Sequence, residues 1–153
     1  MALSSSAESS HGLLNKTMSI NETTFDLIMR HEGFSPRPYK DTRGFLTVGY
    51  GHNLDVDMTQ EEGRALLEIR LRNTIRELLK VLPDLYEYGE NRANALIDMA
   101  FNMGIGGFKG FKEMIKAIKA GNWGLVAEEA ELSFWFSQVG SRSSEIVKML
   151  REE

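Results

Sequence analysis

The strand-forming pattern of this chain is confined to one short stretch, residues 39–50, and that restriction decides the fold class. Aromatic and β-branched residues stand on either side of a turn at residues 42–44, which is the pattern of a β-hairpin. From residue 59 onward, apolar residues recur with the spacing of amphipathic helices. The sequence therefore predicts an α+β protein, mostly helical, in which a long helix joins a small β-hairpin lobe to a helical lobe.

Local signals mark where the predicted helices begin and end. A capping box that starts at Thr23 opens a first helix, which Gly33 can end. A second capping box, Thr59 with Glu62, opens the long helix that Pro83 stops. Further helices are expected at residues 91–103 with Asn91 as N-cap, at 108–120, from the N-cap Asn122 onward, and from about 141 to the C-terminus.

The length of 153 residues suits one domain or two small lobes that share a helix. Residues 1–20 are polar and rich in Ser, and they lack a positively charged start followed by an apolar stretch. We therefore expect a disordered tail and no signal peptide. A catalytic domain is expected over residues 21–153, with a β-lobe at about 33–57 and a helical lobe at about 58–153 that also includes helix 23–32.

Composition excludes several classes of protein. The chain has no cysteine, so disulfides and thiolate chemistry are ruled out, and its three scattered histidines predict no metal site. A formal net charge of −4 argues against a general nucleic-acid binder. No run approaches the roughly 20 apolar residues that span a bilayer, so stable membrane insertion is not expected.

Glu32 is the first candidate for chemistry. It continues the apolar stripe of Phe25, Ile28 and Met29, and it falls at the end of the first predicted helix. The C-terminal end of a helix is negative, and burial disfavours a charged carboxylate, so both effects would hold a proton on this side chain. Glu32 is therefore a candidate general acid, expected at the mouth of a cleft between the two lobes.

Asp41 and Thr47 complete a candidate site on the predicted hairpin. Cleavage of a glycosidic bond needs one protonated carboxyl and one ionised carboxyl with different surroundings. Asp41 stands among polar and basic neighbours that favour its charged form, and the Thr47 hydroxyl on the opposite strand can fix a water molecule. Taken singly, Asp41 as the start of a turn and Thr47 as an ordinary strand residue remain the alternatives.

The three residues follow the spacing Glu-x8-Asp-x5-Thr inside the run HEGFSPRPYKDTRGFLTVGYGHNL. With this spacing the chain resembles the phage lysozyme family of the T-even type, which includes endolysins and tail-associated lysozymes. The resemblance extends over about residues 20–150, with further matching segments at residues 100–104, 120–123, 135–138 and 141–142.

The resemblance implies a muramidase that hydrolyses the β-1,4 bond between N-acetylmuramic acid and N-acetylglucosamine in peptidoglycan, with inversion and without a cofactor. Glu32 would be the general acid, while Asp41 and Thr47 would position the attacking water. Arg142 would pair with Glu32. As a lysis enzyme, such a protein would wait in the host cytoplasm until release and then act on glycan strands of the periplasmic cell wall. As part of a tail or injection apparatus, it would be delivered as cargo, and both alternatives stay open here. We expect a monomer.

Supporting residues and other functions remain open. Phe101, Asn102 and Tyr50 are candidates for lining the sugar groove, although an aromatic residue such as Phe101 can equally belong to the core. The alternatives to a hydrolase are a lytic transglycosylase, which needs the acid but no water-positioning pair, and a non-catalytic peptidoglycan-binding module. The net charge of this chain is negative, whereas the best-known members of the family are strongly basic. Four lysines with helical spacing form a candidate contact with the cell wall, or simply a solvated surface: Lys109, Lys112, Lys116 and Lys119.

Overall fold

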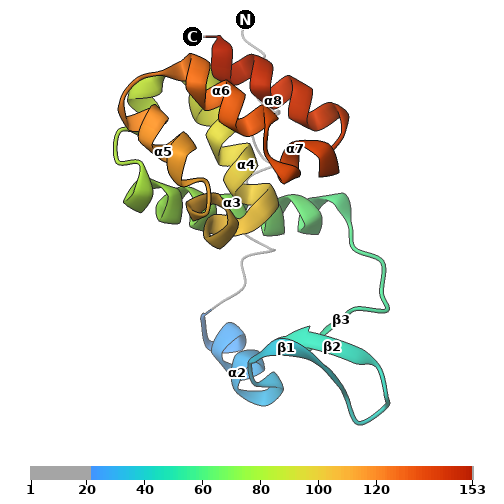
Figure 1. The fold of residues 1–153 in the computed structure, drawn as a ribbon. Helices are drawn as coiled ribbons and strands as arrows, with labels where there is room; N and C mark the ends of the chain where they lie inside the picture. The colour runs from blue at the N-terminus through green and yellow to red at the C-terminus, as the bar shows by residue number, and fades with distance from the viewer. Residues whose placement is uncertain (1–21, 153) are drawn as a thin grey trace, which may run out of the picture. The chain divides into compact units, whose positions relative to one another are not determined.

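A computed structural model describes residues 22–152 of the chain (Figure 1). The chain divides into two compact units, with the first ending at Met58 and the second beginning at Thr59. The predicted tail, residues 1–20, lies outside the described residues. The result is the predicted α+β class, with strands in the first unit and helices in both.

The first unit consists of one helix and a three-stranded sheet. Its elements are α2 (Glu22–Glu32), β1 (Ser35–Lys40), β2 (Leu46–Gly49) and β3 (His52–Asn53). The strands are antiparallel in the order β1-β2-β3, with Tyr39 opposite Thr47 and Thr47 opposite Asn53. The hairpin is therefore confirmed, and β3 is an addition, because a two-residue strand leaves no alternation in the sequence to detect.

Helix α2 ends where the sequence predicts. The Gly33 N–H donates to the carbonyl of Met29 at 3.0 Å, and Gly33 adopts φ +66°, a left-handed conformation that glycine tolerates best. The start differs, since α2 already includes the expected cap Thr23. Phe25 and Ile28 of the apolar stripe are each 52% exposed, and the packing of this stripe on a core stays a prediction.

The second unit is built from helices around one core. Its elements are α3 (Gln60–Val81), a 3-10 helix η1 (Leu85–Tyr88), α4 (Glu90–Lys109), α5 (Lys112–Lys119), α6 (Trp123–Glu131), α7 (Phe134–Gln138) and α8 (Ser141–Arg151). Helix α4 packs against α3 and α8, and α6 packs against α5 and α8. The largest fully buried side chains come from most of these helices: Leu78, Leu96, Met99, Phe108, Ile118 and Leu150. Within residues 22–152, no helix is both long and apolar enough to cross a membrane.

Two of the predicted caps in this unit are confirmed and two boundaries are wrong. The Thr59 capping box is present, and the Asn122 side chain accepts a hydrogen bond from the Leu125 N–H at 3.2 Å. Helix α4, however, begins at Glu90 after the N-cap Gly89, so Asn91 is not its cap. Phe108 belongs to the last turns of α4, which continue beyond a kink at Gly104.

Candidate active site

The Glu32 carboxylate lies against the backbone of Gly51, in the turn between β2 and β3. A Cβ atom built on Gly51 would stand 2.5 Å from Glu32 Oε2 and 2.9 Å from its Cδ, so no larger residue fits there without moving the carboxylate. Gly51 also adopts φ +76°, which favours glycine for a second reason. The candidate acid therefore lies where the end of α2 meets the β2–β3 turn.

Asp41 organises the turn between β1 and β2. Its Oδ1 accepts hydrogen bonds from the backbone N–H groups of Arg43 and Phe45, both at 2.9 Å, and its own N–H donates to the Phe45 carbonyl at 2.9 Å. The alternative weighed for Asp41, that it starts a turn, is thus a real part of its role. Oδ2 faces the Arg43 guanidinium, with 3.6 Å to Nε.

The surroundings of Asp41 favour its charged form. Partial loss of solvation raises the pKa of this carboxyl, but hydrogen bonds from the Phe45 and Arg43 N–H groups lower it, as does the charge of the Arg43 side chain. The net pKa lies below the ordinary aspartate value. Asp41 therefore has the ionised character that the sequence predicts for it.

Thr47 and Asp41 both hydrogen-bond to the carbonyl group of Phe45. The Thr47 side chain is 4% exposed, and its hydroxyl donates to the Phe45 carbonyl at 3.2 Å. This is the carbonyl that also accepts the Asp41 N–H. Since the hydroxyl proton is directed to Phe45, the lone pairs of Thr47 Oγ1 are what the residue can offer to a water molecule.

The other predicted site residues divide between the two units. Tyr50 lies in the β2–β3 turn beside Gly51 and is 43% exposed. Phe101 and Arg142 belong to the second unit, where they line one cavity of about 470 Å³ together with apolar residues of α3 and α4. Pairing of Arg142 with Glu32 stays a prediction.

Arg142 has a partner that the sequence analysis missed. Its Nε and Nη2 donate to the two carboxylate oxygens of Asp98 at 2.8 and 2.6 Å. This hydrogen-bonded pairing raises the pKa of Arg142, so the guanidinium stays charged. A guanidinium carries five N–H donors, so donors remain for a second acceptor.

Asn102 has a structural role in the second unit. Its Oδ1 accepts a hydrogen bond at 2.9 Å from the indole N–H of Trp135, a side chain that is 6% exposed. A buried indole N–H needs such a partner. Trp135 thus belongs to the core of the second unit, whereas contact of Asn102 with sugar stays a prediction.

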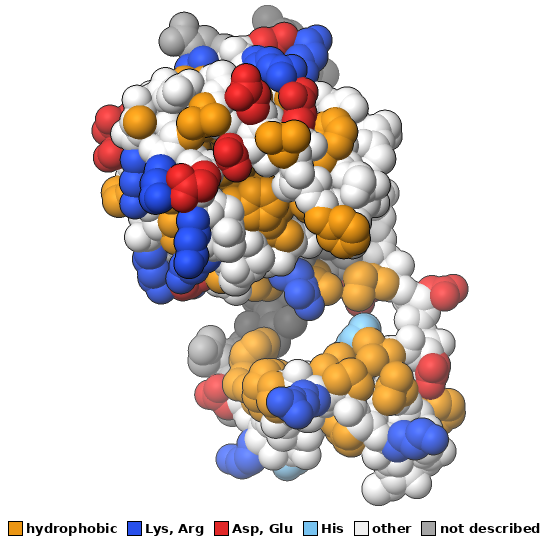
Figure 2. Space-filling model, in the orientation of Figure 1, with side chains coloured by type: hydrophobic (Ala, Val, Ile, Leu, Met, Phe, Trp, Pro, Cys, Tyr) orange, Lys and Arg blue, Asp and Glu red, His pale blue; other side chains and the backbone are white. Residues whose placement is uncertain are grey.

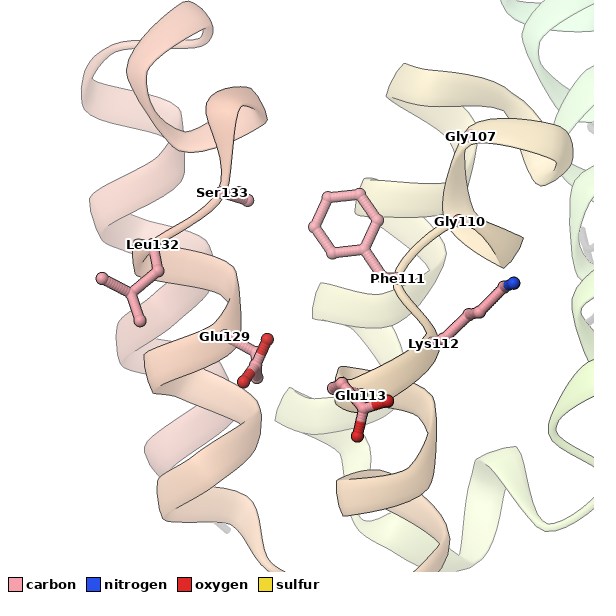
Figure 3. Close-up of a pocket in the computed structure, with 8 residues that line it drawn as sticks. All are labelled: Gly107, Gly110, Phe111, Lys112, Glu113, Glu129, Leu132 and Ser133. Carbon is pink, nitrogen blue, oxygen red and sulfur yellow. The ribbon is translucent and has the colours of Figure 1, made fainter.

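A separate groove of about 630 Å³ opens between α5 and α6 (Figure 3). Figure 3 shows the Phe111 ring pointing into it, with the carboxylates of Glu113 and Glu129 on its two walls. Glu113 is paired with Lys116 at 2.7 Å. None of the residues that the sequence predicts for the active site lines this groove.

The predicted lysine face lies partly on α5. Lys and Arg side chains gather on one side of the second unit (Figure 2). Lys116 is bound to Glu113, which reduces the net positive charge of this face. Its role in binding the cell wall stays a prediction.

Sequence reasoning found the candidate catalytic residues but not the groups that hold them. Gly51 leaves room for the Glu32 carboxylate, the backbone of Phe45 hydrogen-bonds to Asp41 and Thr47, and Asp98 pairs with Arg142. The spacing of residues along the sequence does not reveal contacts of these kinds. Gly51, next to the end of the predicted hairpin, could have indicated such a contact, because glycine in or beside a strand often marks a place where another group approaches the backbone closely.

Comparison with known proteins shows what this chain is similar to. The family model for phage lysozyme matches residues 29–153. The pre-baseplate central spike protein of Enterobacteria phage T4 is 28% identical over 85% of this chain, which spans 28% of that protein's length. A probable T4-type lysozyme of Dictyostelium discoideum is 26% identical over 81% of this chain and 91% of its own length. An endolysin of Acyrthosiphon pisum secondary endosymbiont phage 1 is 29% identical over 77% of this chain and 80% of its own length. The match to more than half of its residues means that this chain belongs to the phage lysozyme family.

Proposed function

We propose that this protein is a lysozyme that hydrolyses peptidoglycan, and that it cleaves the β-1,4 bond between N-acetylmuramic acid and N-acetylglucosamine. Family membership and relatives named lysozyme and endolysin support the general activity. The observation that carries the finer proposal lies within the first unit: a carboxylate at the end of a helix that lies against Gly51, in the same unit as an aspartate whose pKa is lowered.

In the proposed reaction, Glu32 gives its proton to the glycosidic oxygen as the bond from that oxygen to C1 of N-acetylmuramic acid breaks. Water attacks C1 from the opposite face, and its proton passes to Asp41. Thr47 Oγ1 accepts a hydrogen bond from the same water and fixes its direction. Inverting glycosidases keep their two carboxyl groups roughly 6.5–9.5 Å apart to leave room for this water.

The hydrogen bonds of Asp41 fit this role. Oδ1 is occupied by two backbone N–H groups, so Oδ2 is the oxygen that can take the proton. Arg43 and the turn keep the carboxylate ionised before the reaction, as the lowered pKa indicates. Arg142 would pair with Glu32, as the resemblance implies, while Asp98 fixes the Arg142 guanidinium.

Dye-labelled sacculi test the proposal. Wild-type protein should release soluble dye, and Glu32→Gln, which keeps the shape but cannot act as an acid, should lose about 10²–10⁴-fold in rate. Thermal unfolding of both proteins controls for folding. Equal release by the two proteins, or none by a folded wild type, would refute the proposal.

A further inference from the structure

Two large aromatic side chains stand exposed side by side in the first unit. Phe34 is 64% exposed and Tyr50 is 43% exposed, and their ring centroids lie 5.2 Å apart at an interplanar angle of 47°. Hydrophobic side chains gather on the visible face of this unit (Figure 2). Neighbouring exposed aromatic rings are uncommon on a surface that binds nothing.

The pair belongs to the two segments that meet at the Glu32 carboxylate. Phe34 comes two residues after Glu32, directly beyond the glycine that ends α2. Tyr50 immediately precedes Gly51, against which the carboxylate lies. Because both segments meet at Glu32, the ring-to-ring contact joins the end of the helix to the β2–β3 turn beside the candidate acid.

We propose that Phe34 and Tyr50 form a stacking platform for one pyranose ring of the glycan strand, beside the bond that Glu32 cleaves. This inference rests on the proposed function and adds Phe34 as a substrate-binding residue. A pyranose presents C–H groups on its flat face, and these carry the positive charge density that the negative face of an aromatic ring attracts. The hydroxyl groups of the same sugar can hydrogen-bond to nearby polar groups.

The carboxylate argues for a sugar and against an apolar protein partner. A hydrophobic surface laid over the two rings would approach the helix end and the turn between which Glu32 lies, and burying a carboxyl without hydrogen bonds is costly. A sugar covers the rings with C–H groups and still offers hydroxyl and glycosidic oxygens to Glu32. The mixture of ring faces and one carboxyl therefore fits a carbohydrate better than an apolar surface.

Binding of a soluble chito-oligosaccharide to the Glu32→Gln protein tests the platform without hydrolysis. In that background, Phe34→Leu with Tyr50→Leu keeps apolar volume but removes both rings, and we expect about tenfold weaker binding by titration calorimetry. Phe34→Tyr with Tyr50→Phe keeps both rings and should bind as the parent does. Tyr86→Leu is the matched control, because this tyrosine is 62% exposed and lies in η1 of the second unit.

Each outcome bears on the proposal. Unchanged binding by the double leucine variant, folded by thermal unfolding, would overturn the platform. Equal weakening by Tyr86→Leu would also overturn it, because the effect would then not belong to this pair. If the double leucine variant does not fold, the single variants Phe34→Leu and Tyr50→Leu replace it, and each should weaken binding by itself.

Activity separates this inference from the proposed function. In the protein that retains Glu32, loss of the rings should raise KM on solubilised glycan more than it lowers kcat. A wild type that binds the oligosaccharide through the rings yet releases no dye would refute the hydrolase and leave the platform standing. An active wild type whose KM is unaffected by the leucine changes would refute the platform alone.

Discussion

The Glu32 carboxylate lies against Gly51, so close that a Cβ on residue 51 would stand 2.5 Å from Glu32 Oε2. The candidate acid thus lies against a backbone that has no side chain at the point of contact. The position of one carboxylate depends on two segments that are separated in sequence, the end of α2 and the β2–β3 turn.

Substitution of Gly51 should therefore impair activity out of proportion to stability. In Gly51→Ala the new methyl group displaces the carboxylate, and a shift of about 1 Å can cost about 10²-fold in rate. The positive φ should also cost about 1–2 kcal/mol of unfolding free energy. Dye release and chemical denaturation measure the two effects.

Gly49→Ala is the control for this prediction. Gly49 has a similar φ of +67°, but a Cβ there would meet nothing within 4 Å. We expect a similar loss of stability and little loss of activity. If both variants lost activity equally, backbone strain and not the position of Glu32 would be the cause.

Asp41 combines a structural and a proposed chemical role, and two substitutions separate them. Asp41→Asn keeps an oxygen that can accept the N–H groups of Arg43 and Phe45, so the turn and its stability should survive. The charge is lost, so we expect dye release to fall by about 10²-fold or more. Asp41→Ala should lose both activity and part of the stability. Full activity of the Asp41→Asn protein would show that Asp41 only forms the turn and takes no part in the reaction.

The pH dependence of activity should respond to Arg43. This side chain contributes to the lowered pKa of Asp41, so Arg43→Gln should raise that pKa toward its ordinary value. Asp41 must be ionised in the proposed reaction, so the acid limb of the rate profile should move to higher pH. Arg37→Gln removes a charge from β1, in the same unit, and should leave the limb in place. An unmoved limb in Arg43→Gln would contradict the role given to Asp41.

How much the sequence could predict depended on how local each feature is. The helix end at Gly33 and the caps Thr59 and Asn122 each depend on a few neighbouring residues in the sequence, and all three are present in the structure. Helix α7 was missed because five residues are too few to show a period. Phe108 was assigned to the wrong helix because apolar spacing continues across the break at residues 110–111.

The candidate site shows the same division. The spacing of Glu32, Asp41 and Thr47 is a property of the sequence. The contact of Glu32 with Gly51, and the sharing of the Phe45 carbonyl by Asp41 and Thr47, arise only when strands pair and the helix end meets a turn. Such contacts between distant segments leave no periodic signal.

Asn102 offers a prediction about stability. In Asn102→Ala the buried Trp135 N–H loses its acceptor, so the free energy of unfolding should fall by about 1–3 kcal/mol. Asn102→Asp keeps an acceptor oxygen and should recover part of the loss. Chemical denaturation measures both, and oligosaccharide titration of the same proteins tests the predicted contact with sugar. An unchanged stability of Asn102→Ala would show that the indole finds another partner.

The central claim is that a water molecule directed by Asp41 and Thr47 cleaves the glycan with Glu32 as the acid. Mass spectrometry of the fragments released from purified peptidoglycan tests it most directly. We expect reducing N-acetylmuramic acid ends, with water added across the broken bond, from the wild type and almost none from Glu32→Gln. Anhydro-muramic ends from the wild type would contradict it, because they form without an attacking water.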